Sequence, residues 1–300
     1  MKKNILGNSG IEASEIGLGC MSLPTDTKEA GIIVDEAIAQ GINYFDTADL
    51  YNKGVNEEVI GQALKRHRKE IVIATKVGNQ WSSNSDEVQW NPTKAYIKEQ
   101  IHASLRRLQT DYIDLYQLHG GMITDDSEET IEAFEDLKKE GLIRAYGISS
   151  IRPNVIDRFL AKSDISSIMM QYSLLDRRPE ELLDRIGQAG KSVVTRGSLA
   201  KGLLTGEALQ RAGKMDGYLS YEATELNNVL HKLLAVHDNL HALSLQSVLQ
   251  HDTISSVVAG ASSAEQIKAT IKAYETPVSP EQIARATELT RLDIYQEHRE

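Results

Sequence analysis

GINYFDTADLYNKGVNEEVIGQALKRHRKEIVIATK, residues 41–76, contains a strand, a loop, a helix and a second strand in succession. The runs INYFD (42–46) and IVIATK (71–76) are short and apolar, which is typical of buried strands. Between them, NEEVIGQALKRH has apolar residues three and four positions apart, the period of an amphipathic helix. Both strands end in an ionisable residue, Asp46 and Lys76. The stretch therefore predicts one β-α-β unit with polar groups at the carboxyl ends of its strands.

The same alternation continues along the chain. Helical segments such as KEAGIIVDEAIAQ, AYIKEQIHASLRRL and ETIEAFEDLKKEG separate eight short apolar runs: IGLGC (16–20), INYFD (42–46), IVIATK (71–76), YIDLYQLH (112–119), IRAYGIS (143–149), SIMMQYS (167–173), SVVTR (192–196) and ISSVVAG (254–260). Eight strand–helix repeats in a chain of this length are typical of a closed parallel barrel, whereas a doubly wound sheet usually has fewer strands. We therefore expect an α/β fold, a single (β/α)8 TIM barrel that forms one domain over residues 1–300.

Further elements are expected outside this repeat. Turn residues at Asn8-Ser9-Gly10 predict a short N-terminal hairpin, and the segment from Pro280 to about Glu297 predicts an extra C-terminal helix, outside the barrel or across its bottom. Long connections follow the third strand, at 77–92, and the seventh strand, at 197–221. In a barrel both connections would lie at the C-terminal face, where ligand sites form.

Composition narrows the range of partners. The chain carries a formal net charge of -10 at pH 7 and a pI near 5.4, which disfavours nucleic acid and anionic lipid. No apolar stretch is long enough to span a membrane, and the start MKKNILGNSG has no apolar signal core. The single cysteine, Cys20, cannot form an internal disulfide. The expected location is the cytoplasm and the expected partner is a small molecule, while the oligomeric state is left open.

Three strand ends in succession carry ionisable groups: Asp46, Lys76 and His119. Residues two apart in a strand share a face, so each of these side chains can point into the barrel mouth. Tyr51 follows Asp46 closely enough for its loop to fold back over the same mouth. Taken singly, each residue has an ordinary alternative: a turn aspartate, a surface tyrosine, a solvated lysine, or a histidine that ends a strand. Four of them at one end of a barrel favour a site.

This set of groups has a definite chemistry. A tyrosine hydroxyl ordinarily titrates near pH ~10, and an adjacent ammonium, here Lys76, would lower that pKa. Asp46 would pair with Lys76 and hold it, while His119 would hydrogen-bond a substrate oxygen or share the proton. Tyr51 would then donate a proton to a developing alkoxide. The set supplies a proton but no electrons, so a hydride donor has to come from a bound cofactor, most simply a nicotinamide.

Other motifs are weak or missing from the sequence. It contains no HExxH pair, no activated serine or cysteine motif and no glycine-rich phosphate loop before a lysine. His237 and His241 stand four apart on a predicted helix, but no third ligand accompanies them, so a solvated helix face and no metal are expected. Gly17-Leu18-Gly19 lacks the third glycine of a Rossmann fingerprint. Gly19, Cys20 and Met21 are instead expected to approach a cofactor closely.

Seven fragments, in this order and spacing, resemble the aldo-keto reductase superfamily: GINYFDTADLYNKGVNEEVIG, ATK at Lys76, DLYQLHG, YGISS, MQYSLL, AKGLLTG and AGASSAEQIKATI. The resemblance covers nearly the whole chain, and the sequence is most similar to bacterial, Bacillus-type members of the family. It implies a (β/α)8 barrel that binds NADPH in an extended form without a Rossmann domain and reduces aldehydes or ketones to alcohols. It also implies Tyr51 as the proton donor, with Asp46, Lys76 and His119 as its catalytic partners, and Asp46 is expected to contact the cofactor as well.

The resemblance further implies which residues bind the cofactor. Ser149 and Gln171 fall where the family hydrogen-bonds the nicotinamide carboxamide. Arg196 falls where many relatives have an aromatic ring stacked on the nicotinamide. A loop would cross the pyrophosphate, with Lys201 as its charge partner; it comprises Gly197, Ser198, Leu199, Lys201, Gly202 and Leu203. A later segment would hold the adenosine phosphate; it comprises Gly260, Ala261, Ser262, Gln266 and Thr270.

Three features depart from the family pattern. Ser150 replaces the asparagine that commonly follows the strand-five serine, which implies one carboxamide contact that is lost or mediated by water. Arg196 provides a planar guanidinium that can stack on a ring but also adds positive charge. Ser262 and Thr270 stand where relatives often carry a basic residue and an asparagine, so that only Lys268 is left nearby as a cation. NADH therefore becomes possible beside NADPH.

Two other functions are compatible with a barrel of this kind. One is a nicotinamide-binding regulatory subunit that senses redox state with little turnover, which the intact set of four catalytic residues disfavours. The other is a metal-dependent sugar isomerase, which needs more carboxylate and histidine ligands at strand ends than the sequence offers. The favoured function is an NAD(P)H-dependent oxidoreductase that acts on small carbonyl compounds.

Overall fold

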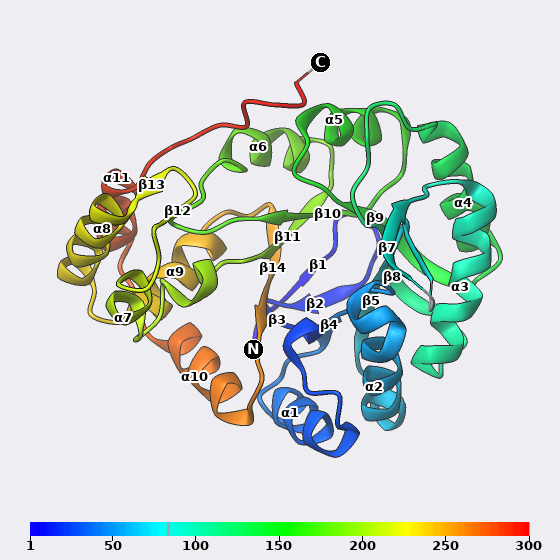
Figure 1. The fold of residues 1–300 in the computed structure, drawn as a ribbon, viewed down its shortest axis with the longest axis horizontal. Coiled ribbons are helices and arrows are strands. Elements are labelled where there is room, and N and C mark those ends of the chain that lie inside the picture. Colours follow the sequence, from blue (N-terminus) through cyan, green and yellow to red (C-terminus); the bar gives the residue numbers. More distant parts are fainter. Residues whose placement is uncertain (83–84, 300) are drawn as a thin grey trace.

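Eight parallel strands form a closed barrel at the centre of the structure, a computed structural model that describes residues 1–82 and 85–299 (Figure 1). Each strand pairs with the next barrel strand in the sequence, and the last closes on the first. The strands are β3 (Ile16–Gly19), β4 (Tyr44–Asp46), β5 (Val72–Val77), β8 (Ile113–Leu118), β9 (Ile143–Ser149), β10 (Ser167–Gln171), β11 (Ser192–Arg196) and β14 (Ile254–Gly260). All eight apolar runs are barrel strands, and the prediction of a TIM barrel is confirmed.

Helices surround the barrel, as the ring around the central strands in Figure 1 shows. The sequence provides their ends: the Asp26 carboxylate accepts hydrogen bonds from the first backbone N–H groups of α1, and Gly41 and Gly141 follow α1 and α4 with positive φ. The helices that connect barrel strands or follow the last one are α1 (Thr27–Ala39), α2 (Val55–Leu64), α3 (Lys94–Leu108), α4 (Ser127–Lys139), α5 (Pro153–Lys162), α6 (Glu180–Gln188), α9 (Leu240–Leu249) and α10 (Ala264–Glu275).

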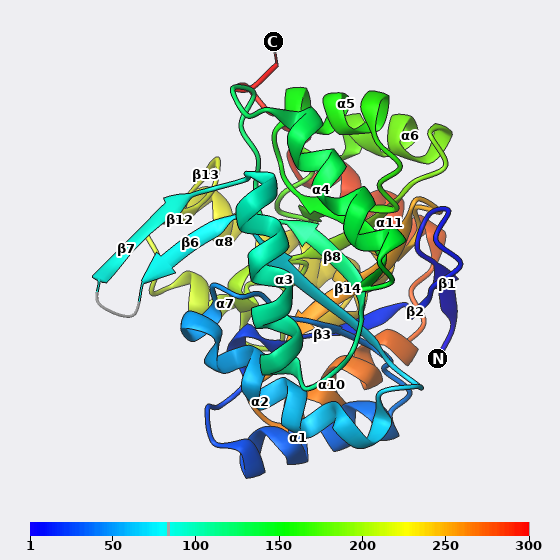
Figure 2. The same ribbon diagram turned by 90° about the vertical axis from the view of Figure 1, so that its right-hand side faces the viewer.

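Two antiparallel hairpins mark the two ends of the barrel. The predicted N-terminal hairpin is formed by β1 (Lys3–Ile5) and β2 (Glu12–Ser14), and neighbouring apolar residues join the cluster inside the barrel. A second hairpin, β6 (Asn79–Ser82) and β7 (Ser85–Trp90), follows β5 and projects from the opposite end (Figure 2). The predicted long connection at 77–92 therefore lies at the C-terminal face, although residues 83–84 of it lie outside the described residues.

The connection after β11 contains structure of its own. It holds a 3-10 turn (Ala200–Gly202), α7 (Ala208–Ala212), β12 (Gly217–Tyr218) and β13 (Tyr221–Glu222), and leads into α8 (Ala223–Val236). Its apolar side chains form a second buried cluster with those of α8. The segment expected as a long connection at 197–221 is therefore a packed extension of the barrel, because it buries apolar surface of its own.

The C-terminal helix is shorter than expected. Helix α11 (Pro280–Leu289) begins with a capping box between Ser279 and Gln282 and packs against α8 and α9, on the outside of the barrel. Residues 290–299 continue without helix, so the predicted end near Glu297 is wrong. The reason is tertiary: the backbone N–H of Arg291 donates to the Tyr221 hydroxyl at 2.6 Å, and the Tyr295 side chain is buried.

Two helical glycines give opposite predictions for replacement by alanine. A Cβ on Gly61 in α2 would lie 2.5 Å from the backbone oxygen of Arg107, so Gly61→Ala should lower the free energy of unfolding by about 1–3 kcal/mol. A Cβ on Gly31 in α1 would meet nothing within 4 Å, so Gly31→Ala should raise it by about 0.5–1 kcal/mol. Urea unfolding measures both. Shifts of the same sign would contradict the close packing of α2 on α3.

Candidate active site

The C-terminal ends of β4, β5 and β8 bring together three of the predicted site residues. Asp46 ends β4, Lys76 is the penultimate residue of β5, and His119 follows β8 directly. The register pairs Asp46 with Ala74 and Lys76 with Gln117, so the polar residues lie at the same edge of the parallel sheet. The apolar residues that alternate with them on these strands join one cluster inside the barrel, as the period-two pattern predicts.

A buried ion pair forms the base of this group. The Lys76 Nζ atom lies 2.6 Å from Asp46 Oδ1 and 2.7 Å from the backbone oxygen of Thr47, and the two charged residues are 1% and 4% exposed. Burial opposes the ammonium form of Lys76, but the Asp46 carboxylate and the nearby Tyr51 outweigh it and raise the pKa of Lys76. The lysine is therefore a fixed positive charge at neutral pH.

A tight turn returns Tyr51 to this ion pair. After Tyr51, the backbone of Asn52, Lys53 and Gly54 has positive φ in succession, a left-handed conformation that disfavours the two side-chain-bearing residues by roughly 1–2 kcal/mol each. Such strain concentrates at functional sites because the surrounding structure enforces it. The Tyr51 hydroxyl lies 3.5 Å from Lys76 Nζ, and its ring meets that of His119 edge-on at 6.0 Å between centroids.

The pKa of Tyr51 differs from the expectation. Burial is the largest influence and raises the pKa, whereas Lys76 lowers it, as expected, but by less. The net direction is upward, so the prediction of a lowered pKa is wrong. The cause is the depth of the side chain in the mouth, which sequence position does not specify. Tyr51 therefore holds its hydroxyl proton at neutral pH, as a proton donor must.

His119 is neutral in this environment. Burial, Lys76 and Arg196 together lower the pKa of His119 to about 3. Its backbone N–H donates to Val77 at 2.8 Å, while the Nδ1 atom of its ring has no hydrogen-bond partner among the described residues. A neutral imidazole can donate one hydrogen bond and accept one, so His119 can orient an oxygen without adding charge.

The depressed pKa of His119 predicts a pH dependence of stability. Between its usual value of 6.5 and about 3, the unfolded chain binds a proton at His119 that the folded chain does not. The free energy of unfolding should therefore fall as the pH falls through this window, by at most about 1.4 kcal/mol per pH unit. His119→Gln should flatten this dependence in urea unfolding, whereas His231→Gln at an exposed position should not. Parallel curves for wild type and His119→Gln would contradict the prediction.

The residues expected to bind a nicotinamide lie around the same mouth. Gln171 and Arg196 end the adjacent strands β10 and β11, and Ser149 ends β9. The Gln171 amide oxygen accepts a hydrogen bond from Arg196 at 2.9 Å, and its nitrogen donates to Asp176 at 2.9 Å. Arg196 is exposed, but its charge reaches the mouth: it helps to lower the pKa of His119 and opposes part of the rise that burial causes in the pKa values of Asp46 and Tyr51. The guanidinium therefore adds positive potential to the mouth.

The other expected cofactor residues divide by exposure. Those with exposed or partly exposed positions are Gly19, Met21, Gly197, Leu199, Lys201, Gly202, Gly260, Ser262 and Gln266. Those that are buried, and so could contribute mainly through backbone or packing, are Cys20, Ser198, Leu203, Ala261 and Thr270. Gln266 Oε1 accepts a hydrogen bond from the Ser262 backbone at 2.8 Å, and the Lys268 ammonium lies 3.4 Å from Glu36. The cation nearest to this segment is thus already paired.

Several features of the site were not apparent in the sequence. The Thr47 carbonyl is a second partner of Lys76, and the Thr47 hydroxyl donates to Asn56, which in turn donates to the Cys20 backbone. Asp176 holds the Gln171 amide. Only the proximity of Thr47 to Asp46 in the chain could have indicated the first contact, and no sequence signal indicates the last.

Two other sequence features have structural roles. The Trp90 indole N–H donates to Asp125 at 3.0 Å, and a Cβ on Gly78 would lie 2.8 Å from its ring, so Trp90 anchors the hairpin. His237 caps the end of α8 while His241 lies in the first turn of α9, so the prediction that both lie on one helix is wrong. Among residues 1–82 and 85–299, no cluster of three metal-ligating side chains occurs.

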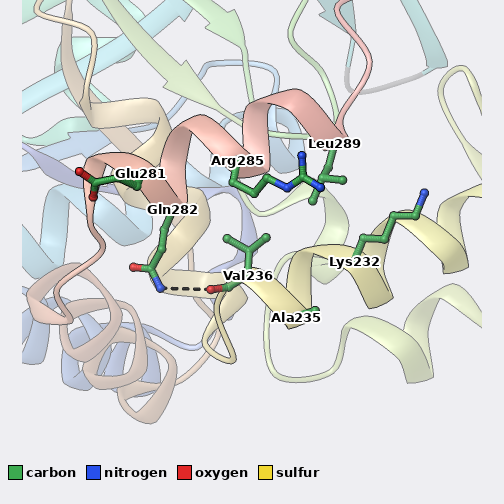
Figure 3. Close-up of a pocket in the computed structure, with 7 residues that line it drawn as sticks. All are labelled: Lys232, Ala235, Val236, Glu281, Gln282, Arg285 and Leu289. Carbon is green, nitrogen blue, oxygen red and sulfur yellow. Dashed lines mark hydrogen bonds between the residues drawn. The ribbon is translucent and has the colours of Figure 1, made fainter.

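A surface hollow of about 570 Å³ lies between α8 and α11 (Figure 3). Its lining includes Lys232, Arg285 and Gln282, and the Gln282 amide donates to the Val236 backbone oxygen at 3.1 Å. It shares no residue with the barrel mouth and contains no buried acid, base or nucleophile, so the mouth is the better candidate for chemistry. In the described part of the chain, no helix has the length and apolarity needed to cross a membrane.

Comparison with known proteins places this arrangement in a family. The model of the Aldo/keto reductase family matches residues 15–291. The chain belongs to the aldo/keto reductase family. It is 52% identical to the uncharacterized oxidoreductase YqkF of Bacillus subtilis (strain 168) over 100% of both chains. It is 30% identical to the NADH-specific methylglyoxal reductase of Escherichia coli (strain K12), over 93% of this chain and 95% of the relative.

A solved structure agrees with this assignment. The holo form of the aldo-keto reductase AKR11C1 from Bacillus halodurans superimposes with a TM-score of 0.96 at 53% identity, over 100% of both chains. The resemblance to the superfamily noted in the sequence is thus confirmed. As an aldo/keto reductase, the chain is one of a family of oxidoreductases that use nicotinamide cofactors and act on small carbonyl compounds.

Proposed function

We propose that this aldo/keto reductase reduces aldehydes or ketones to alcohols, with NADPH as the hydride donor and Tyr51 as the proton donor. The observation that carries the proposal is the buried Lys76 ammonium, 2.6 Å from Asp46 and 3.5 Å from the Tyr51 hydroxyl, beside a neutral His119. A positive charge at this point stabilises the phenolate that remains after the proton has left. The arrangement therefore suits protonation of a developing alkoxide.

Each of the four residues has a distinct part in this proposal. Tyr51 holds the proton at its hydroxyl oxygen and releases it to the substrate oxygen. Lys76 lowers the cost of that release, and Asp46 fixes the ammonium with a hydrogen bond of 2.6 Å. His119 donates a hydrogen bond from a neutral ring, which orients the carbonyl oxygen and leaves the proton transfer to Tyr51.

The residues around the mouth fit a nicotinamide. When bound there, NADPH would supply the hydride that reduces the carbonyl carbon. Ser149, Gln171 and Arg196 offer hydrogen bonds and a planar cation at three neighbouring strand ends. Gly197 has a φ of +69°, and a Cβ there would lie 3.1 Å from Gln171, so glycine keeps the space beside that amide open. The proposal assigns the rest of the cofactor to the loop through Lys201, which follows β11, and to the segment at Ser262 and Gln266, which follows β14.

The choice of cofactor and the setting follow from charge and composition. We propose NADPH, with Arg196 and Lys201 as the exposed cations that face it, and NADH as the competing donor, because Lys268, the cation of the segment around Ser262, is already paired with Glu36. We propose a single-domain, cytoplasmic protein that binds small molecules. The net charge of -10 argues against nucleic acid and anionic membrane as partners, and a single buried cysteine is consistent with the cytoplasm.

Steady-state assays with purified protein test the proposal. Oxidation of NADPH and, separately, of NADH would be followed with a panel of small aldehydes and diketones. Turnover that needs the carbonyl compound and survives a chelator is the expected result. Tight nicotinamide binding without turnover would instead favour a redox-sensing subunit, and loss of activity with chelator would favour metal-dependent chemistry.

A substitution at Ser262 is expected to change the cofactor preference. Ser262→Arg places a guanidinium at the exposed position expected to meet the adenosine phosphate. Because hydrogen bonds between charged groups are stronger than neutral ones but are screened at a surface, the ratio of NADH to NADPH dissociation constants should rise about three- to tenfold. Gln250→Arg adds the same charge at the exposed end of α9, far from this segment, and should leave the ratio unchanged. An unchanged ratio in Ser262→Arg would remove the segment from the cofactor site.

A further inference from the structure

Charged groups fix the side-chain amide of Gln171 from both sides. Its Nε2 atom donates to Oδ2 of Asp176 at 2.9 Å, and its Oε1 atom accepts from Arg196 at 2.9 Å. A carboxylate only accepts hydrogen bonds and a guanidinium only donates them, so the two partners together specify which end of the amide is oxygen and which is nitrogen. One Nε2 hydrogen is left over for a third partner.

Asp176 is in turn held by its own loop. Arg178 grips the carboxylate with two hydrogen bonds, at 2.7 and 2.8 Å, in the forked geometry that makes such pairs directional. The backbone groups of Ser173 and Asp176 bond each other in both directions, which fixes the short turn after β10. Asp176 is only 3% exposed and the Arg178 side chain 26%, so the carboxylate end of this pair is shielded from solvent.

The C-terminal tail, residues 290–299, completes the arrangement. The Arg178 guanidinium lies 5.0 Å from the ring centroid of Tyr295, and this ring is 5% exposed. Glu181 at the start of α6 ties the tail in place, because its carboxylate accepts from the Tyr295 backbone at 3.1 Å and pairs with Arg299 at 2.8 Å. Figure 1 shows the tail crossing outside α6 on its way to the C-terminus. A continuous series of contacts thus runs from Tyr295 through Arg178 and Asp176 to Gln171.

We propose that Asp176 and Arg178, seated against Tyr295, are positioning residues that set the orientation of the Gln171 amide toward the nicotinamide carboxamide. The inference rests on the proposed function, since it requires a nicotinamide at Gln171. A carboxamide presents one acceptor and one donor group, so a Gln171 amide free to flip would pair with either end of it. With the amide fixed, its spare Nε2 hydrogen selects the carboxamide oxygen and thereby favours one orientation of the ring.

Asp176→Asn tests this role with little change of shape. Asparagine offers an amide nitrogen as well as an oxygen, so it weakens the hold of Arg178 and lets the Gln171 amide turn. The dissociation constant for NADPH, measured by calorimetry, should rise about tenfold, the size of effect expected when a charge-assisted hydrogen bond is lost. The transfer of deuterium from NADPH labelled on one face should also become less selective, which a merely structural defect would not cause.

Matched variants separate positioning from loss of structure. Asp157→Asn removes a carboxylate from an exposed Asp–Arg pair between α5 and α6 and should alter neither readout. Tyr295→Ala should weaken NADPH binding, and Tyr295→Phe, which restores the ring over Arg178, should recover it. The urea unfolding of each variant reports any global destabilisation.

The outcomes distinguish this inference from the proposed function. Wild-type protein that binds neither NADPH nor NADH would overturn both. Wild-type protein that binds NADPH while Asp176→Asn binds it equally well, with unchanged selectivity of deuterium transfer, would overturn only the positioning role. If Tyr295→Phe and Tyr295→Ala lose the same affinity for NADPH, the ring of Tyr295 does not help to position the Gln171 amide.

Discussion

Tyr51→Phe is expected to lower carbonyl reduction by about 10²- to 10⁴-fold, the range for loss of a positioned general acid. The phenylalanine ring keeps the edge-on contact with His119 at 6.0 Å and removes only the hydroxyl beside Lys76. Because burial raises the pKa of Tyr51, this hydroxyl carries its proton across the neutral range and is the proposed source of the transferred proton. His119, with a pKa of about 3, is a neutral imidazole at neutral pH and does not carry the second proton that an acid would give up.

The dissociation constant for NADPH separates catalysis from binding in this variant. It should match that of wild type, because Tyr51 is not among the residues proposed to contact the cofactor. Tyr112→Phe, a change of the same kind at a partly buried ring under Arg68 just before β8, should leave turnover intact. Turnover at the wild-type rate in Tyr51→Phe would overturn the assignment of the proton donor, whereas a lost cofactor affinity would indicate a misfolded mouth.

The barrel could be predicted from sequence because each of its strands is buried on both faces. Such strands are short continuous apolar runs, and the helices between them carry a separate, clear period. The strand ends then place Asp46, Lys76 and His119 at one edge without any knowledge of tertiary contacts. For this reason the group of Asp46, Tyr51, Lys76 and His119 could be predicted from the sequence.

Contacts between segments that are distant in the chain could not be predicted in this way. The interval from Asp176 to Tyr295 spans much of the chain, and no local pattern predicts that the tail returns to cover Arg178. The same holds for the end of α11, whose helical pattern was extended too far because the tail is held in place by Tyr221 and Glu181. The predicted direction of the Tyr51 pKa was wrong for a related reason, because the burial that raises this pKa arises only when the barrel mouth is assembled.

Lys76→Met is expected to lower the free energy of unfolding by about 3–5 kcal/mol, the cost of leaving a buried charge without its partner. It should also remove turnover, because the Tyr51 phenolate loses the ammonium that stabilises it. The loss of stability comes from Asp46, which is 4% exposed and has Lys76 as its ion-pair partner at 2.6 Å. Urea unfolding at neutral pH measures the first effect and the carbonyl reductase assay measures the second.

A double variant tests whether the pair accounts for this cost. Asp46→Asn removes the charge that Lys76→Met leaves unpaired, so Asp46→Asn combined with Lys76→Met should be more stable than Lys76→Met alone. If the double variant is destabilised relative to wild type by the sum of the two single effects, the two side chains act independently and the ion pair is not the reason.

The pH dependence of Lys76→Met gives a second, independent readout of the same pair. Burial raises the pKa of Asp46, and Lys76 is the largest influence that opposes this rise. With Lys76 present the pKa of Asp46 is already above its ordinary value of 3.8, and without Lys76 it should rise further, so that the folded variant binds a proton at Asp46 over a wider pH range in which the unfolded chain has released it. A group whose pKa is higher in the folded state stabilises the fold at low pH and loses this contribution as the pH rises. Lys76→Met should therefore lose stability relative to wild type as the pH rises above about 4, and the difference should shrink in acid. A gap between the two proteins that stays constant from acid to neutral pH would show that Asp46 is not left charged and buried when Lys76 is removed.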